Sequence, residues 1–126
     1  MKGHLIETRL TLIKNLEDAV FKNDFDLTQE CLLKINKESI KQVLNSTNSG
    51  SQTLLHRACR NGNPKIVKLL LENGAIARPH YYTKYSPLYI ACHMGNTDIA
   101  RMILEVIYMS MTISFLSALY FIQQSS

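Results

Sequence analysis

Apolar residues in the first part of the chain recur at the spacing of an amphipathic helix. The residues that share one face are Leu5, Leu12, Leu16, Ala19 and Val20. Charged residues fall largely on the opposite face, namely Arg9, Lys14, Glu17, Asp18 and Lys22. This stripe predicts a helix over residues 5–23 that packs one side against a core. Asn23 and Asp24 interrupt the pattern and predict its end.

Two shorter helices are predicted next. An apolar stripe of Leu27, Cys31 and Leu32 predicts a helix over residues 26–35. Asp26 is the expected N-cap, because its carboxylate can accept hydrogen bonds from first-turn amides. Residues 37–44 predict another short helix, and the polar cluster that follows predicts a turn.

One stretch of sequence returns 33 residues later. Residues 53–63, TLLHRACRNGN, align with residues 86–96, SPLYIACHMGN, with Ala, Cys, Gly and Asn in the same places. The apolar residues that follow also align, with IV and LL at 66–67 and 69–70 over IA and MI at 99–100 and 102–103. A fixed period of this length is typical of a repeat architecture.

The period and its residues are similar to those of the ankyrin-repeat family, whose units have 33 residues. The residues that match its motif are Thr53, His56, Ala58, Gly62 and Gly74 in one unit and Ser86, Pro87, Ala91 and Gly95 in the next. The resemblance implies an all-α solenoid of stacked helix-loop-helix units with short β-hairpin-like loops. It says little about function, because the same scaffold serves many unrelated partners.

The pattern divides the chain into three parts. Residues 1–50 are interpreted as a degenerate capping repeat, with an unrelated helical hairpin as the alternative. Residues 51–105 are predicted to hold two repeats, 51–83 and an incomplete 84–105. An atypical terminal repeat is expected because one of its sides faces water. Residues 106–126 form an apolar tail.

Three motif residues have expected structural roles. Thr53 is expected to cap the first helix of its repeat. Gly62 fits the left-handed residue that ends a short helix. The resemblance implies that His56 hydrogen-bonds backbone groups of the neighbouring loop. Leu54 stands in the usual proline place, which Pro87 retains.

Composition narrows the class of protein. A length of 126 residues, 46% hydrophobic and 19% charged, suits one globular domain. The net charge of +4 comes without a dense Lys/Arg block, so a nucleic-acid partner is not expected. Three dispersed cysteines and the lack of a secretory leader favour an intracellular, cytoplasmic protein.

The chemistry-bearing residues favour no enzyme and no cofactor. Cys59 and Cys92 occupy one repeat position, roughly 10 Å apart at the usual interhelical spacing, too far for a disulfide. Both are expected to be buried, inert thiols. Zinc-ligand spacing, a nucleophile with its base and a phosphate-binding loop are all absent from the sequence.

The strongest binding candidate is the loop between the two repeats. Its candidate residues are Arg78, His80, Tyr81, Tyr82, Lys84 and Tyr85. Tyr and Arg are the residue types that dominate interface energies, although these tyrosines could instead cover their own hairpin stem. Arg57, Arg60 and His93 would add a basic face suited to an acidic or phosphorylated partner. We therefore expect a monomeric, non-catalytic protein–protein interaction module.

The tail after the second repeat leaves three interpretations open. Residues 106–122 are uncharged and mostly apolar, at the lower limit of the roughly 17–25 residues that span a bilayer. They could anchor a membrane adaptor, although four Ser/Thr interrupt them and no basic residues flank them. They could pack over the open end of the second repeat. They could also mark a short or truncated form of a longer ankyrin protein.

Overall fold

The computed structural model describes residues 8–47, 52–77 and 85–125, and these form seven helices. The helices are α1 (Arg9–Phe21), α2 (Phe25–Lys34), α3 (Lys37–Leu44), α4 (Leu54–Asn61), α5 (Pro64–Glu72), α6 (Pro87–His93) and α7 (Thr97–Ser125). Strands are absent from these residues. Most of the loop between the two repeats, for which the resemblance implies a hairpin-like form, lies outside them at 78–84.

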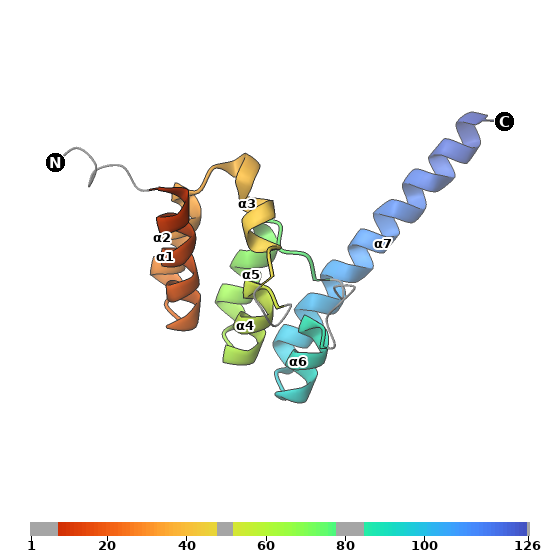
Figure 1. Cartoon of the computed structure of the whole chain (residues 1–126). Helices are drawn as coiled ribbons and strands as arrows, with labels where there is room; N and C mark the ends of the chain where they lie inside the picture. The colour runs from red at the N-terminus through yellow and green to blue at the C-terminus, as the bar shows by residue number, and fades with distance from the viewer. Residues whose placement is uncertain (1–7, 48–51, 78–84, 126) are drawn as a thin grey trace.

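Six of the helices form three stacked layers, as Figure 1 shows. Helix α1 pairs with α2, α4 with α5, and α6 with α7. The first helices contact one another in the order α1, α4, α6, and the second helices in the order α2, α5, α7. Helix α3 leads from the first layer to the second. The predicted all-α solenoid is confirmed.

The core lies between the layers and is built from equivalent residues of the two repeats. Ala58 and Ala91 are buried, and their small side chains let neighbouring first helices approach closely. Leu70 and Ile103 are fully buried on the second helices. Full burial of such an aliphatic side chain contributes about 1.5–3 kcal/mol.

Helix ends follow local capping chemistry, with one correction. The predicted N-cap Asp26 lies in the first turn of α2, and the cap is Asp24. The Asp24 backbone is extended, and its Oδ1 accepts a 3.0 Å hydrogen bond from the Leu27 amide. Gly62 has φ +78° at the C-cap of α4, as predicted. Asn63 then caps α5, because its Oδ1 accepts from the Lys65 amide at 3.0 Å.

Helix α7 departs most from expectation. The incomplete second repeat was predicted to span residues 84–105, but its last helix continues to Ser125 and projects away from the layers (Figure 1). Its side chains from Tyr108 to Gln124 are exposed, so the tail does not cover the open end of the second repeat. That interpretation was therefore wrong. The apolar residues still extend the helix because neither glycine nor proline occurs between 96 and 126.

Candidate partner-binding surface

A groove of about 280 Å³ lies where the first layer meets the second. Helix α1, the end of α3, the segment before α4, and α4 itself all contribute to it. Its apolar lining is Ile13, Phe21, Val43 and Leu54. Its polar lining is Glu17, Ser46, Thr47, Gln52, Thr53, Arg57 and Arg60. The groove therefore combines an apolar surface with two guanidinium groups.

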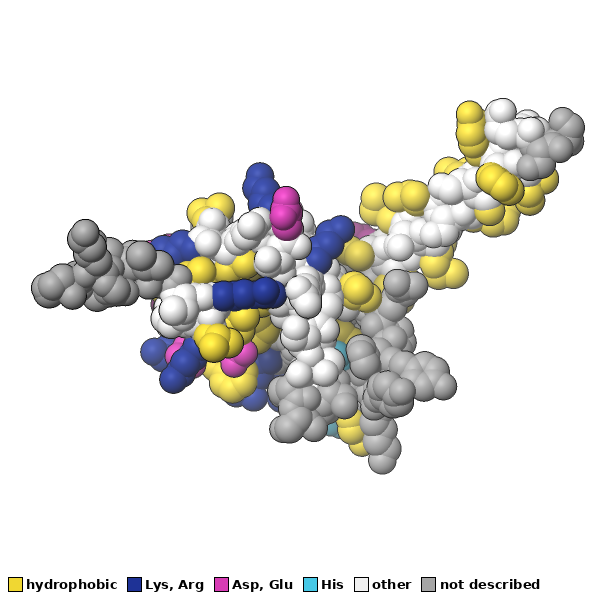
Figure 2. Space-filling view, turned by 45° about the horizontal axis from the view of Figure 1, so that its top comes forward, with side chains coloured by type: hydrophobic (Ala, Val, Ile, Leu, Met, Phe, Trp, Pro, Cys, Tyr) yellow, Lys and Arg dark blue, Asp and Glu magenta, His cyan; other side chains and the backbone are white. Residues whose placement is uncertain are grey.

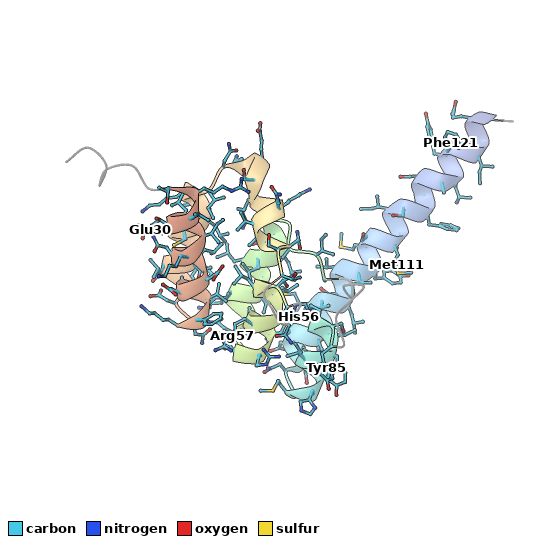
Figure 3. All side chains as sticks on the ribbon, in the orientation of Figure 1. Glu30, His56, Arg57, Tyr85, Met111 and Phe121 are labelled. Carbon is cyan, nitrogen blue, oxygen red and sulfur yellow. The ribbon has the colours of Figure 1, made fainter. Side chains whose placement is uncertain are left out.

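Arg57 is held against an aromatic ring. Its guanidinium carbon lies 4.3 Å from the centre of the Phe21 ring, a cation–π contact between α4 and α1. The Nε atom is buried and makes no hydrogen bond to any described residue. The planar ring thus fixes the guanidinium in the groove without neutralising its charge (Figure 3 labels Arg57).

Arg60 lies one turn further along α4. Its Nη1 donates to Oε1 of Gln52 at 3.1 Å, and its side chain is half-buried. Two arginines three residues apart share one side of a helix. Local sequence thus places Arg57 and Arg60 along one wall of the groove, and the basic face predicted from Arg57, Arg60 and His93 together remains a prediction.

The start of α4 is fixed by a reciprocal cap beside the groove. The Thr53 amide donates to Nδ1 of His56 at 3.0 Å, and the Thr53 hydroxyl lies 2.9 Å from the same nitrogen. An accepting Nδ1 places the ring proton of neutral His56 on Nε2. His56 thus accepts from the N-cap residue of its own helix, and the implied hydrogen bonds to the neighbouring loop remain a prediction. The cap supports one end of the groove.

A second cluster gathers on α6, apart from the groove. The rings of Tyr85 and Tyr89 have centroids 4.8 Å apart. The rings of Tyr89 and His93 are stacked, with centroids 5.9 Å apart. Ser86 begins this helix by accepting from the Tyr89 amide at 3.0 Å, as its place in the motif predicts. His93 therefore belongs to an aromatic cluster with Tyr89 and Tyr85. Arg57 and Arg60 instead line the groove between the first and second layers.

Several of the predicted binding residues are not described by the structure. Arg78, His80, Tyr81, Tyr82 and Lys84 lie outside the described residues.

Phe21 and Tyr89 were not among the binding candidates of the sequence analysis. The sequence does carry a signal for Tyr89, because a tyrosine stands where the preceding repeat has the buried His56. In the structure its side chain is 49% exposed. Phe21 is 36 positions from Arg57, and nothing in the local sequence indicates that they pair.

The two repeat cysteines differ in environment, which corrects the prediction that both are buried. Cys59 is fully buried, and burial raises the pKa of its thiol to about 12, against a smaller lowering by Arg60. Cys92 is exposed. The cause is that α6 packs on α4, whereas among the described residues no first helix of a further layer packs on α6.

Comparison with known proteins identifies the family. The model described as ankyrin repeats (3 copies) matches residues 16–113. This chain belongs to the ankyrin-repeat family. Ankyrin repeats bind other proteins, so the chain is a protein–protein interaction module of a type that is typically non-catalytic. The match begins within α1, and the division into a capping repeat and two further repeats remains a prediction.

Several ankyrin proteins are similar to this chain. Mouse protein phosphatase 1 regulatory subunit 27 is 36% identical over 52% of this chain and 43% of its own. The Notch-regulated ankyrin repeat-containing protein of Xenopus tropicalis is 33% identical over 56% of this chain and 71% of its own. The crystal structure of the human ASB11 ankyrin repeat domain matches with a TM-score of 0.60 and 25% identity, covering 72% of this chain and 38% of that one.

The chain spans less than half the length of the first of these relatives. Over residues 8–47, 52–77 and 85–125, no group of three or more His, Cys, Asp or Glu could hold a metal ion. By length and composition alone, α7 could cross a membrane.

Proposed function

We propose that this ankyrin-repeat chain binds an acidic segment of another protein in the groove lined by Arg57 and Arg60. The observation that carries the proposal is the pair of guanidinium groups beside an apolar lining, with Arg57 fixed on Phe21. A planar guanidinium recognises carboxylate or phosphate oxygens through paired hydrogen bonds. The apolar residues would take the aliphatic or aromatic neighbours of the acidic group.

Two further features support a protein partner. The cluster of Tyr85, Tyr89 and His93 offers half-exposed aromatic rings, the residue type enriched at interfaces. The predicted binding loop, residues 78–85, leads into this cluster and remains a candidate contact. The name of one relative, a regulatory subunit of a phosphatase, also describes a protein that acts with another protein. We propose an intracellular, non-catalytic role.

The test is retention of the full chain on immobilised peptides that carry acidic, phosphorylated, neutral or basic side chains beside apolar residues. We expect acidic and phosphorylated peptides to retain it, and the double variant Arg57→Ala/Arg60→Ala to bind at least about tenfold more weakly. The matched control is Lys37→Ala/Lys65→Ala, which removes the same charge from exposed positions outside the groove. Equal loss in both variants would show a net-charge effect and contradict a groove site.

A second candidate function is that of a membrane-attached adaptor, favoured by the long apolar helix α7. Residues 106–122 are uncharged, and all but Ile107 are exposed. Figure 2 shows hydrophobic side chains along its projecting part. Co-flotation with lipid vesicles, resistant to alkaline extraction, is expected of the full chain. The variant Ile113→Arg/Leu116→Arg should abolish it, and Leu10→Arg/Leu33→Arg should not. Flotation that survives the first variant would rule out this anchor.

The prediction of a short or truncated form of a longer ankyrin protein concerns the gene. It is tested by transcripts that cover residue 105. A transcript that continues with a Gly-Ala exit and further repeats would support it, and one that always encodes residues 106–126 would contradict it.

A further inference from the structure

One side of α7, facing away from α5, carries the same residue types as the side of α5 that faces α7. Lys68, Leu71 and Glu72 of α5 line a groove of about 550 Å³ between the two helices. On the other wall of this groove, α7 contributes Asp98, Arg101, Met102, Glu105, Val106 and Met109. The α5 residues therefore form one wall of a groove where two layers meet.

Thirty-three residues later, α7 carries the same residue types in the same order. Arg101, Leu104 and Glu105 follow Lys68, Leu71 and Glu72 as a basic residue, a leucine and a glutamate. They line a second groove, of about 580 Å³, together with Ile107, Tyr108, Met109 and Met111. All the lining residues of this groove belong to α7. α7 thus forms one wall of this groove, and no other described helix forms the opposite wall.

Side chains in the open groove are more exposed than their equivalents on α5, which α7 partly covers. Leu71 is half-buried against the core. Leu104 is 51% exposed, and Tyr108 and Met111 lie further along the helix at 74% and 66% exposed. A contiguous apolar surface with a polar rim is typical of an interaction site.

We infer that the open side of α7 pairs with α7 of a second copy of this chain, antiparallel, with the two-fold axis close to Leu104. The charges at its rim favour this occupant. Arg101 and Glu105 lie four residues apart on either side of the axis. Antiparallel pairing therefore places each arginine opposite the other copy's glutamate, and the interface is complementary to itself. Closed two-fold dimers are also the commonest homo-oligomers.

This dimer goes beyond the proposed peptide groove, which lies between α1 and α4 and stays free. It replaces the sequence-based expectation of a monomer, which took no account of a continued α7. Antiparallel pairing also sends the two projecting ends of α7 in opposite directions. Pairing and insertion of both tails into one bilayer therefore exclude each other, so vesicle binding and self-association give separable results.

The first test is sedimentation velocity of the full chain in lipid-free buffer across micromolar concentrations. We expect a reversible species of twice the 14.4 kDa chain mass. Arg101→Glu and Glu105→Arg should each raise the dimer Kd by about tenfold, because each replaces two attractive pairs with two repulsive ones. The double variant Arg101→Glu/Glu105→Arg should restore the dimer. Circular dichroism checks that each variant keeps its helices.

The second test places a cysteine at the axis. Leu104→Cys, in a Cys92→Ser background, should form a disulfide-linked dimer under mild oxidation. Leu33→Cys in the same background is the control, since Leu33 is 82% exposed on α2 at the other end of the stack. A monomer at all concentrations, an aggregate that ignores the charge exchange, equal cross-linking at position 33, or recovery of the chain only with lipid would overturn the dimer.

Discussion

Helices α5 and α7 occupy the same place in successive repeats and end very differently. Helix α5 has 9 residues and stops at Glu72, whereas α7 runs for 29 residues to Ser125, the last described residue. After α5, Gly74 takes φ +103° and donates to the Leu71 carbonyl at 3.1 Å. The Ala75 amide donates to the Leu70 carbonyl at 3.0 Å, which completes a Schellman motif.

The corresponding positions in α7 are Val106 and Ile107, where α5 is followed by Asn73 and Gly74. A β-branched residue does not adopt the left-handed conformation readily, so the helix continues. Burial on α7 nevertheless ends where the repeat ends, since Ile103 is fully buried and residues 108–124 are exposed. The signal that ends a helix and the surface that packs it are therefore separate properties of a repeat. The second repeat has the packing surface but lacks the stop signal.

The largest expected effect separates the buried and projecting parts. Leu70→Ala should lower the free energy of unfolding by about 2–5 kcal/mol, because it leaves a cavity between layers. Leu116→Ala, on the projecting part of α7, should change it by no more than about 0.5 kcal/mol. Denaturant titration followed by circular dichroism measures both. Comparable losses would mean that the projecting part packs on the repeats.

The buried Cys59 should make stability fall in alkali. Burial raises the Cys59 pKa from 9.0 to about 12, so between these values the unfolded thiol ionises while the folded thiol keeps its proton. The stabilising contribution is complete below pH 9 and is lost as pH rises towards 12, by about 1.4 kcal/mol per pH unit. Cys59→Ala should flatten this part of the stability–pH curve. Equal slopes in the variant and the unchanged protein would argue against a buried Cys59.

Glycines after the helices should also differ. Gly74→Ala should cost more than Gly95→Ala, and each left-handed alanine costs about 1–2 kcal/mol. The difference arises because a Cβ at Gly74 would lie 2.7 Å from Cγ of Lys41, whereas at Gly95 it would meet nothing within 4 Å. Thermal unfolding of the two variants gives the order, and the reverse order would contradict the contact with Lys41.

A further effect is expected from restoring the stop signal. Val106→Asn/Ile107→Gly should end the helix near Glu105, as in α5. Residues 108–125 would then form a separate segment without tertiary packing, from which most helical stability in proteins comes. The helical circular dichroism signal should fall, whereas the free energy of unfolding should lie within about 1 kcal/mol of that of Val106→Ala/Ile107→Ala, which also removes the packing of Ile107 on the core. The double variant Val106→Ala/Ile107→Ala should keep the full signal.

Much of the fold could be predicted from local sequence. The helices of the two repeats, the turn at Gly62 and the cap at Asn63 follow from spacing and residue type. Asp24 was missed as a cap because Asp26, two residues later, offers the same chemistry. The full length of α7 does not follow from the repeat pattern, because that pattern ends with the second repeat while the helix continues.

The candidate site could be predicted only in part. Arg57 and Arg60 follow from their places on the first helix, but the Phe21 contact depends on how two layers meet. The exposure of Cys92 depends on which helix covers α6, a property that equivalent repeat positions do not share. Residues at equivalent repeat positions therefore differ in contacts and exposure because their tertiary neighbours differ.

The most direct test of the separation between layers and projecting helix is limited chymotrypsin digestion of the full chain in dilute solution. Cleavage is expected at the exposed residues Phe115 to Phe121, and the remaining layers should keep their Tm within about 3 °C. A Tm lower by more than about 5 °C, or cleavage within α4 and α5 at the same rate, would contradict the account by showing that the projecting part of α7 stabilises the repeats.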